Sequence, residues 1–207
     1  MNGLSTYVIY VADYLGVPYP PPRVSVFQPM SYLGYNYASG SCGILPETGK
    51  FINLYNFGAR KILVFELGPI GCIPSIVKSS KLNGKCDENK NEIVNMFNTQ
   101  LGLLLENLTT TLPDSHFIFG KAHGLGYDAI INPTKYGLRD SSNPCCNTWG
   151  NGTLSCIPAE SPCLAPDEHY FWDGYHLTQA TYSVIATQCI SGFDVCLPMN
   201  IQQLVQV

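Results

Sequence analysis

The residues best suited to chemistry are Asp173 and His176, which stand three positions apart in FWDGYHLTQATY, residues 171–182. A histidine accepts a proton near neutral pH, and a carboxylate on its other ring nitrogen fixes the tautomer and stabilises the imidazolium. An Asp-x-x-His turn just before a helix can bring the two side chains together by itself. The pair therefore predicts half of a hydrolytic triad in a packed, aromatic setting. The alternative reading of this spacing is a solvated surface pair.

Composition excludes some partners. The chain has 207 residues, is 45% hydrophobic and 13% charged, and carries a net charge of −4. This length is enough for one domain with a core. No cluster of Lys or Arg supplies the basic face that phosphate neutralisation requires, so nucleic acid is not expected as a partner.

Nine cysteines indicate disulfide bonds and a protein of the secretory pathway. Two sequons, at Asn107 and Asn151, point the same way and are candidate glycosylation sites. The odd count leaves at least one thiol free or intermolecular. No Cys-x-x-Cys pair exists and the four histidines show no zinc-type pairing with cysteines, so no metal is expected. The cysteines are Cys42, Cys72, Cys86, Cys145, Cys146, Cys156, Cys163, Cys189 and Cys196.

The first 22 residues conflict with export. They show no basic start, no apolar signal core and no cleavage site, and their apolar stretch is too short to span a membrane. Two interpretations stay open: the protein is not exported, or its amino terminus is missing.

Hydrophobic periodicity predicts alternating helices and strands, and hence α/β layers with a parallel sheet. Helices are expected over residues 4–15, 87–111, 124–132 and 178–189, and strands over 60–68, which reads as buried, and 116–119. Residues 31–49 read as a loop. Residues 140–166 read as a disulfide-tied loop of the kind that lies over an active-site face.

Two helices have predicted caps and inward faces. Asp87 is expected to cap the long helix and Thr178 the last one. The expected buried stripe of the long helix consists of Ile93, Phe97, Leu101, Leu104 and Leu108. The expected inward residues of the last helix are Ala180, Val184 and Ile185.

Several motifs, in order, resemble the plant GDSL-type esterases/lipases within the SGNH hydrolases. The segment FWDGYHLTQA resembles the family's last block, and NYASGSCGIL (36–45) resembles its second block. The strand and Gly-Pro turn of the family resemble LYNFGARKILVFELGPIGCIPS (54–75). The pattern of the family's long helix is matched by Cys86, Asn91 through Asn98 and Leu101. The pattern of its cysteine loop is matched by Asn132-Pro133, Tyr136-Gly137, Cys145-Cys146, Cys156 and Cys163. The resemblance covers most of residues 2–190.

This resemblance implies a three-layer α/β/α fold with a parallel sheet, incomplete here, in one partial domain over residues 1–207. It also implies secretion and hydrolysis of lipid or other acyl esters by a Ser–His–Asp mechanism. Asp173 would orient the histidine, His176 would be the base, and Gly40 would donate to the oxyanion hole. The family requires no metal or organic cofactor.

Two blocks of the family pattern are missing from the printed sequence. It contains neither Gly-Asp-Ser, which would supply the nucleophile, nor Gly-x-Asn-Asp, which would supply an oxyanion-hole asparagine. We expect the first block upstream of Met1 and the second to be deleted between Lys50 and Phe51. We therefore predict an inactive chain; the alternative is a non-catalytic remnant or a binding protein on an SGNH scaffold. Cys42 is expected to be structural or free rather than a substitute nucleophile.

The cysteines leave pairings open. A bridge between Cys72 and Cys86 would close a loop of about 15 residues and stabilise the fold by roughly 3 kcal/mol; the alternative is two unpaired thiols. The four cysteines between residues 145 and 163 are expected to tie the late loop, whereas Cys189 and Cys196 match no part of the family pattern. No role is assigned to His116, His123 or His169. Leu177 replaces a proline that is usual in the family.

Overall fold

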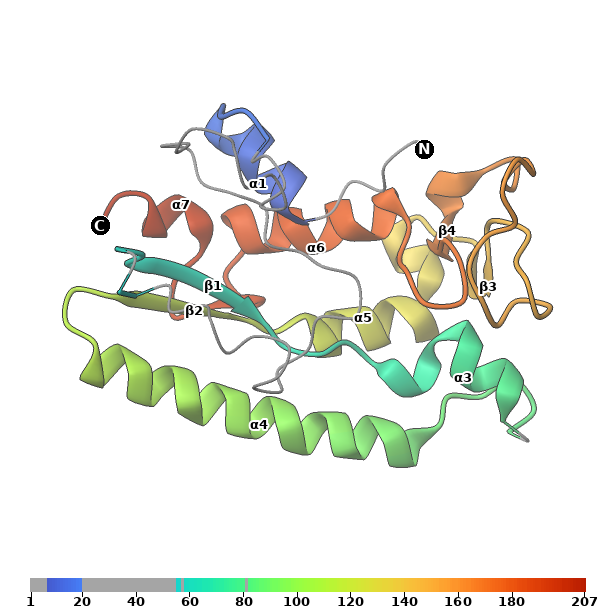
Figure 1. Ribbon diagram of the computed structural model, residues 1–207, viewed down its shortest axis with the longest axis horizontal. Helices are drawn as coiled ribbons and strands as arrows, with labels where there is room; N and C mark the ends of the chain where they lie inside the picture. Colours follow the sequence, from blue (N-terminus) through green and yellow to red (C-terminus); the bar gives the residue numbers. More distant parts are fainter. Residues whose placement is uncertain (1–6, 20–54, 57, 81) are drawn as a thin grey trace.

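The computed structural model describes residues 7–19, 55–56, 58–80 and 82–207 (Figure 1). The predicted loop at 31–49, with Gly40 and Cys42, lies outside these described residues. Within them, helix α4 (Glu88–Thr111) runs along one side of strands β1 (Lys61–Phe65) and β2 (His116–Gly120) (Figure 1). Helices α6 (Gln179–Ser191) and α7 (Ile201–Leu204) lie on the other side (Figure 1). Helix α1 (Tyr7–Leu15) packs on α6, where the Tyr10 hydroxyl donates to the carbonyl of Gln179 at 3.0 Å.

The main sheet confirms the α/β prediction with parallel strands. Strand β1 (Lys61–Phe65) pairs in parallel with β2 (His116–Gly120), in register from Lys61↔His116 to Phe65↔Gly120. Strand β5 (Cys196–Leu197), which was not predicted, adds to β2 in antiparallel orientation. The strand predicted over residues 60–68 is present, but the prediction that it is buried is wrong. Because β1 is at the edge of the three described strands, Lys61 is exposed and the rest of the strand is half-buried.

Helix α4 (Glu88–Thr111) crosses over between the two parallel strands, and the Asp87 side chain caps it by accepting from the Lys90 N–H, as predicted. The predicted stripe is correct only in part: Phe97, Leu101 and Leu108 are half-buried, but its other two residues are exposed. Ile93 and Leu104 are 67% and 52% exposed, whereas the residues buried on this helix are Asn91, Val94, Asn98 and Leu105. The inward face therefore lies about one residue, or roughly 100°, around the helix from the apolar pattern.

The other predicted helices are present as α1 (Tyr7–Leu15), α5 (Ala122–Ile131) and α6 (Gln179–Ser191). Thr178 caps α6 by accepting from the Thr181 N–H. Ile185 is buried, while Ala180 and Val184 are partly buried. Further short elements were not predicted: α3 (Pro74–Ser79), α7 (Ile201–Leu204) and 3-10 turns at Ile70–Cys72, Pro133–Tyr136 and Pro166–Glu168.

A second, two-stranded sheet holds the late loop. Strand β3 (Asp140–Pro144) pairs in parallel with β4 (His169–Phe171), so the prediction of an unbroken loop over 140–166 is corrected at its start. The polar sequence of β3 has low strand propensity, so the strand could not be predicted; it forms because it pairs with β4. The four disulfides are Cys72–Cys86, Cys145–Cys163, Cys146–Cys156 and Cys189–Cys196.

These disulfides decide the open pairings. The bridge between Cys72 and Cys86 is present, and two bridges tie the late loop as expected. Cys189 and Cys196, which match nothing in the family pattern, join α6 to β5 and lie in the main buried cluster with Ile118. Among the described helices, none combines the length and the apolar character needed to cross a bilayer.

Candidate active site

The segment 170–178 forms a tight turn between β4 and α6. Phe171 and Leu177 form an antiparallel bridge, and the Trp172 N–H donates to the carbonyl of His176 at 2.8 Å. The Thr178 N–H donates to the carbonyl of Tyr170 at 3.0 Å, and the Thr178 hydroxyl donates to the carbonyl of His169. The same threonine thus closes the turn and starts the helix. Tyr170 and Phe171, only 2% and 1% exposed, anchor the turn in the second core cluster.

The turn brings Asp173 and His176 together. The Nδ1 atom of His176 lies 2.9 Å from Oδ2 and 3.0 Å from Oδ1 of Asp173. The backbone N–H groups of Tyr175 and His176 also donate to Oδ1, at 2.8 and 2.7 Å. These donors satisfy a carboxylate that is only 4% exposed.

The imidazole faces outward. The side chain of His176 is 59% exposed, in contrast to 6% for that of Asp173. A hydrogen bond from Nδ1–H to the carboxylate leaves the lone pair on Nε2, the nitrogen that points away from Asp173. The arrangement can therefore accept a proton from a group that approaches on the solvent side.

Gly174 is a site residue that sequence reasoning missed. Its N–H donates to the carbonyl of Leu154 at 3.0 Å, and its own carbonyl accepts from the Ser75 N–H at 3.0 Å. A Cβ at this position would lie 2.7 Å from the carbonyl atoms of Thr153. Only glycine allows the cysteine loop to approach the turn this closely, so the loop and α3 together hold Asp173 in place.

A pocket of about 230 Å³ adjoins the turn. Tyr175 and Leu177, the neighbours of His176 on both sides, line it. One side of it is formed by residues 66–73, here called the pocket wall, which follow the carboxyl end of β1. Other lining residues come from β4, α5 and α6, including Phe171, Ile130 and Ile185. The pocket lies beyond the carboxyl end of a parallel strand, where open α/β sheets bind ligands.

Glu66 is the one carboxylate that lines this pocket among the described residues. Its Oε1 accepts from the His123 N–H at 2.5 Å, which satisfies a donor in the first turn of α5. Burial raises the pKa of Glu66, although the His123 N–H and the nearby charge of Lys121 act against the shift. The ionised form is therefore less favourable in the folded protein than in the unfolded chain.

The raised pKa of Glu66 makes folding stability depend on pH. Its contribution is fully present below the unfolded-state pKa and is lost as pH rises through the higher folded-state pKa. We expect Glu66→Gln to flatten this part of the profile, because Gln can still accept from the His123 N–H and does not ionise. Urea unfolding from pH ~4 to ~8, without reductant, measures it. Glu92→Gln, an exposed change on α4, is the control and should keep the wild-type slope.

The remaining predicted residues lie apart from this site. Asn107 is exposed on α4, and Asn151 is exposed in a turn between Cys146 and Cys156, with φ of +54°. His123, to which the sequence assigned no role, donates its backbone N–H to Glu66. Within the described ranges, no group of three or more His, Cys, Asp and Glu side chains is placed to hold a metal ion.

The sequence model of the GDSL-like lipase/acylhydrolase family matches residues 10–188. This span is most of the chain and includes both the Asp-x-x-His turn and the pocket wall. The chain belongs to this family.

Plant relatives of this family are similar to the chain over different extents. GDSL esterase/lipase 7 of Arabidopsis thaliana is 35% identical over 202 residues, which cover 94% of the chain and 54% of that protein. GDSL esterase/lipase At1g71691 of the same plant is 38% identical over 159 residues, or 76% of the chain and 41% of that protein. The chain thus spans about half the length of the curated relatives it matches.

Proposed function

We propose that Asp173 and His176 are the orienting acid and the general base of carboxylic ester hydrolysis in this GDSL-family protein. The observation that carries the proposal is the geometry of the turn. A buried, fully hydrogen-bonded carboxylate holds Nδ1 of His176, while the ring is open to solvent next to an apolar pocket. Those are the requirements for a base that acts on an ester held at the pocket.

In this mechanism Nε2 of His176 takes the proton of a nucleophilic hydroxyl as the hydroxyl oxygen attacks the ester carbonyl. Asp173 stabilises the imidazolium that results, and His176 then donates the proton to the leaving alcohol, which leaves an acyl-serine. A water that gives its proton to Nε2 of His176 attacks the acyl carbonyl in turn, so that the acid is released and the serine recovers its proton. By family pattern the nucleophile is the serine of Gly-Asp-Ser, and Gly40 donates to the oxyanion. The substrate class is a lipid or other acyl ester, whose apolar part would occupy the pocket of about 230 Å³.

The 207 residues as printed contain no Gly-Asp-Ser and no Gly-x-Asn-Asp. Loss of the serine from a triad costs about 10⁶ in turnover, or roughly 8 kcal/mol of barrier. We infer that this polypeptide by itself has no useful esterase activity. The intact pocket beside the turn supports a second candidate, a protein that binds acyl compounds without hydrolysing them.

A chromogenic short-chain ester assay on the purified 207-residue protein, paired with a fluorophosphonate probe, tests the inference of inactivity. We expect no labelling by the probe and no turnover above that of His176→Ala. Turnover that the fluorophosphonate blocks would show that a serine within these residues is activated, and would overturn the inference.

Secretion and glycosylation belong to the same proposal, because four disulfides form stably only in an oxidising compartment. Asn107 and Asn151 are both exposed and thus accessible to a glycan. Expression through a eukaryotic secretory pathway should give a protein whose mass falls on treatment with an N-glycosidase. Asn107→Gln and Asn151→Gln should each remove one step of that shift. An unchanged mass in the wild-type protein would reject both sites.

A further inference from the structure

Helix α4 holds the pocket wall, residues 66–73, from the side opposite the pocket. Two buried asparagines on α4 make this contact, Asn91 and Asn98, which are 3% and 5% exposed. Their separation of seven residues is two helical turns, so both lie on one face of the helix. Because amides are costly to bury without partners, their hydrogen bonds indicate what they do.

Asn98 binds both backbone groups of a single wall residue. Its Oδ1 accepts from the Leu67 N–H at 2.9 Å, and its Nδ2 donates to the Leu67 carbonyl at 2.9 Å. The amide thus takes the place of a neighbouring strand at the residue just beyond Glu66, whose own N–H still pairs with the carbonyl of Gly120 on β2. The pair of bonds fixes the direction in which the chain leaves β1.

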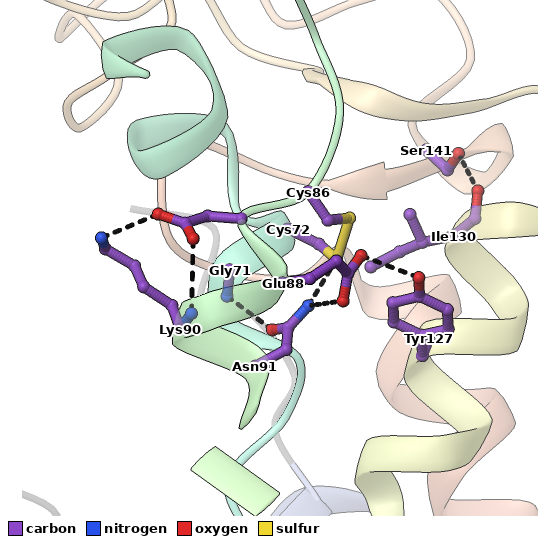
Figure 2. The surroundings of a disulfide bond; sticks show 10 residues. Gly71, Cys72, Cys86, Glu88, Lys90, Asn91, Tyr127, Ile130 and Ser141 are labelled. Carbon is purple, nitrogen blue, oxygen red and sulfur yellow. Dashed lines mark hydrogen bonds and ion pairs between the residues drawn. A yellow bond between two sulfur atoms is a disulfide. The ribbon is translucent and has the colours of Figure 1, made fainter. Parts of the chain in front are cut away.

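Asn91 holds the other end of the wall (Figure 2). Its Oδ1 accepts from the Gly71 N–H at 2.8 Å, and its Nδ2 donates to Oε2 of Glu88 at 3.1 Å and contacts Sγ of Cys72 at 3.5 Å. The Gly71 carbonyl accepts from the Asp87 N–H at 2.8 Å. Both ends of the wall are therefore attached to α4 or to the residue that caps it.

The wall is also joined to the Asp-x-x-His turn. It continues directly into α3, where the Ser75 N–H donates to the carbonyl of Gly174 at 3.0 Å. Gly174 follows Asp173, so a displacement of the wall moves the apolar side of the pocket relative to the imidazole of His176. The apolar groups concerned are Pro69, Ile70 and Ile73, which line the pocket.

We propose that Asn91 and Asn98 are positioning residues that set the pocket wall at the distance from His176 that an acyl chain requires. Neither asparagine lines the pocket, so each acts through the backbone it binds. The inference rests on the proposed function, because it takes the pocket as the acyl site. It predicts that these two amides control acyl affinity more than they control folding.

Asn98→Leu is the informative substitution. It keeps roughly the size of asparagine and removes both hydrogen bonds to Leu67. Because Leu67 is 40% exposed, water can bind its backbone groups instead. The fold should then survive while the wall is free to move. Asn98→Asp keeps an acceptor for the Leu67 N–H but loses the donor, so it should retain part of the effect. Asn95→Leu, exposed on the same helix, is the matched control.

The test is the binding of decanoate to the full 207-residue protein, measured by calorimetry and by the NMR signal of the His176 ring. Each variant is measured where circular dichroism shows it to be folded. We expect decanoate to bind the wild type and shift the His176 signal. Asn98→Leu and Asn91→Leu should weaken binding on the order of tenfold, Asn98→Asp less, and Asn95→Leu less than twofold.

Three results separate this inference from the function on which it rests. If the wild type neither binds decanoate nor shows a shift at His176, the assignment of the pocket to acyl groups fails, and the positioning role fails with it. If the wild type binds and the leucine variants at positions 91 and 98 bind equally well, only the positioning role is overturned. A lower unfolding midpoint with unchanged affinity also overturns the positioning role alone, because a purely structural amide would change stability and leave binding intact.

Discussion

His176→Ala is expected to lower kcat for ester hydrolysis by about 10⁶ in a chimera that supplies the missing blocks. The chimera adds the Gly-Asp-Ser block before Met1 and the Gly-x-Asn-Asp block between Lys50 and Phe51, both taken from a full-length relative such as GDSL esterase/lipase 7. The reason for the large effect is that the variant removes the proposed base that takes the proton of the serine hydroxyl. Steady-state kinetics with a chromogenic butyrate ester measures the loss.

Asp173→Asn in the same chimera should cost about 10⁴ in kcat. The asparagine side chain would present an N–H to Nδ1 and favour the tautomer in which Nε2 carries the proton, so the base is lost although the turn persists. His116→Ala, at the start of β2, is the control and should leave kcat within a few-fold of the parent chimera. Activity of the His176 variant within tenfold of the parent would show that another residue is the base.

Elements with strong local signals were predictable from the sequence. The Asp87 and Thr178 caps start α4 and α6 as expected, because an N-cap needs only its own side chain and the next turn of backbone. The Asp173–His176 contact was predictable for the same reason, since both side chains belong to one turn of four residues. The parallel pairing of β1 with β2 followed from the order of strand, helix and strand.

Features that depend on distant partners could not be predicted. Asn91 and Asn98 are polar, so the apolar periodicity of the helix predicts that they face solvent, whereas their hydrogen bonds to the backbone of the pocket wall account for their burial. The same cause turned the inward face of α4 away from Ile93 and Leu104. Gly174 gave no signal, because its requirement comes from the carbonyl groups of a loop about twenty residues earlier in the chain.

Gly71→Ala is expected to destabilise the fold by about 3 kcal/mol or more. A Cβ at position 71 would lie 2.1 Å from the carbonyl oxygen of Asp87 and 2.8 Å from Oδ1 of Asn91. That carbonyl also accepts from the Lys90 and Asn91 N–H groups in the first turn of α4, so it cannot move away without loss of the helix start. Urea unfolding without reductant measures the change. Gly124→Ala is the control, because an added Cβ there would meet no atom within 4 Å apart from its chain neighbours and the backbone of its own helix, and it should be neutral or stabilise by up to about 1 kcal/mol.

The bridge between Cys72 and Cys86 should enlarge the cost of Gly71→Ala. With the two Cα atoms held 4.3 Å apart, the backbone at Gly71 cannot separate from that at Asp87 to admit a methyl group. Removing the bridge by Cys72→Ser with Cys86→Ser should itself cost roughly 3 kcal/mol, but Gly71→Ala should then cost less than it does in the bridged protein. Equal costs with and without the bridge, within about 0.5 kcal/mol, would contradict this. The collision would then be set by the hydrogen bonds from α4 to the pocket wall, with no contribution from the covalent link.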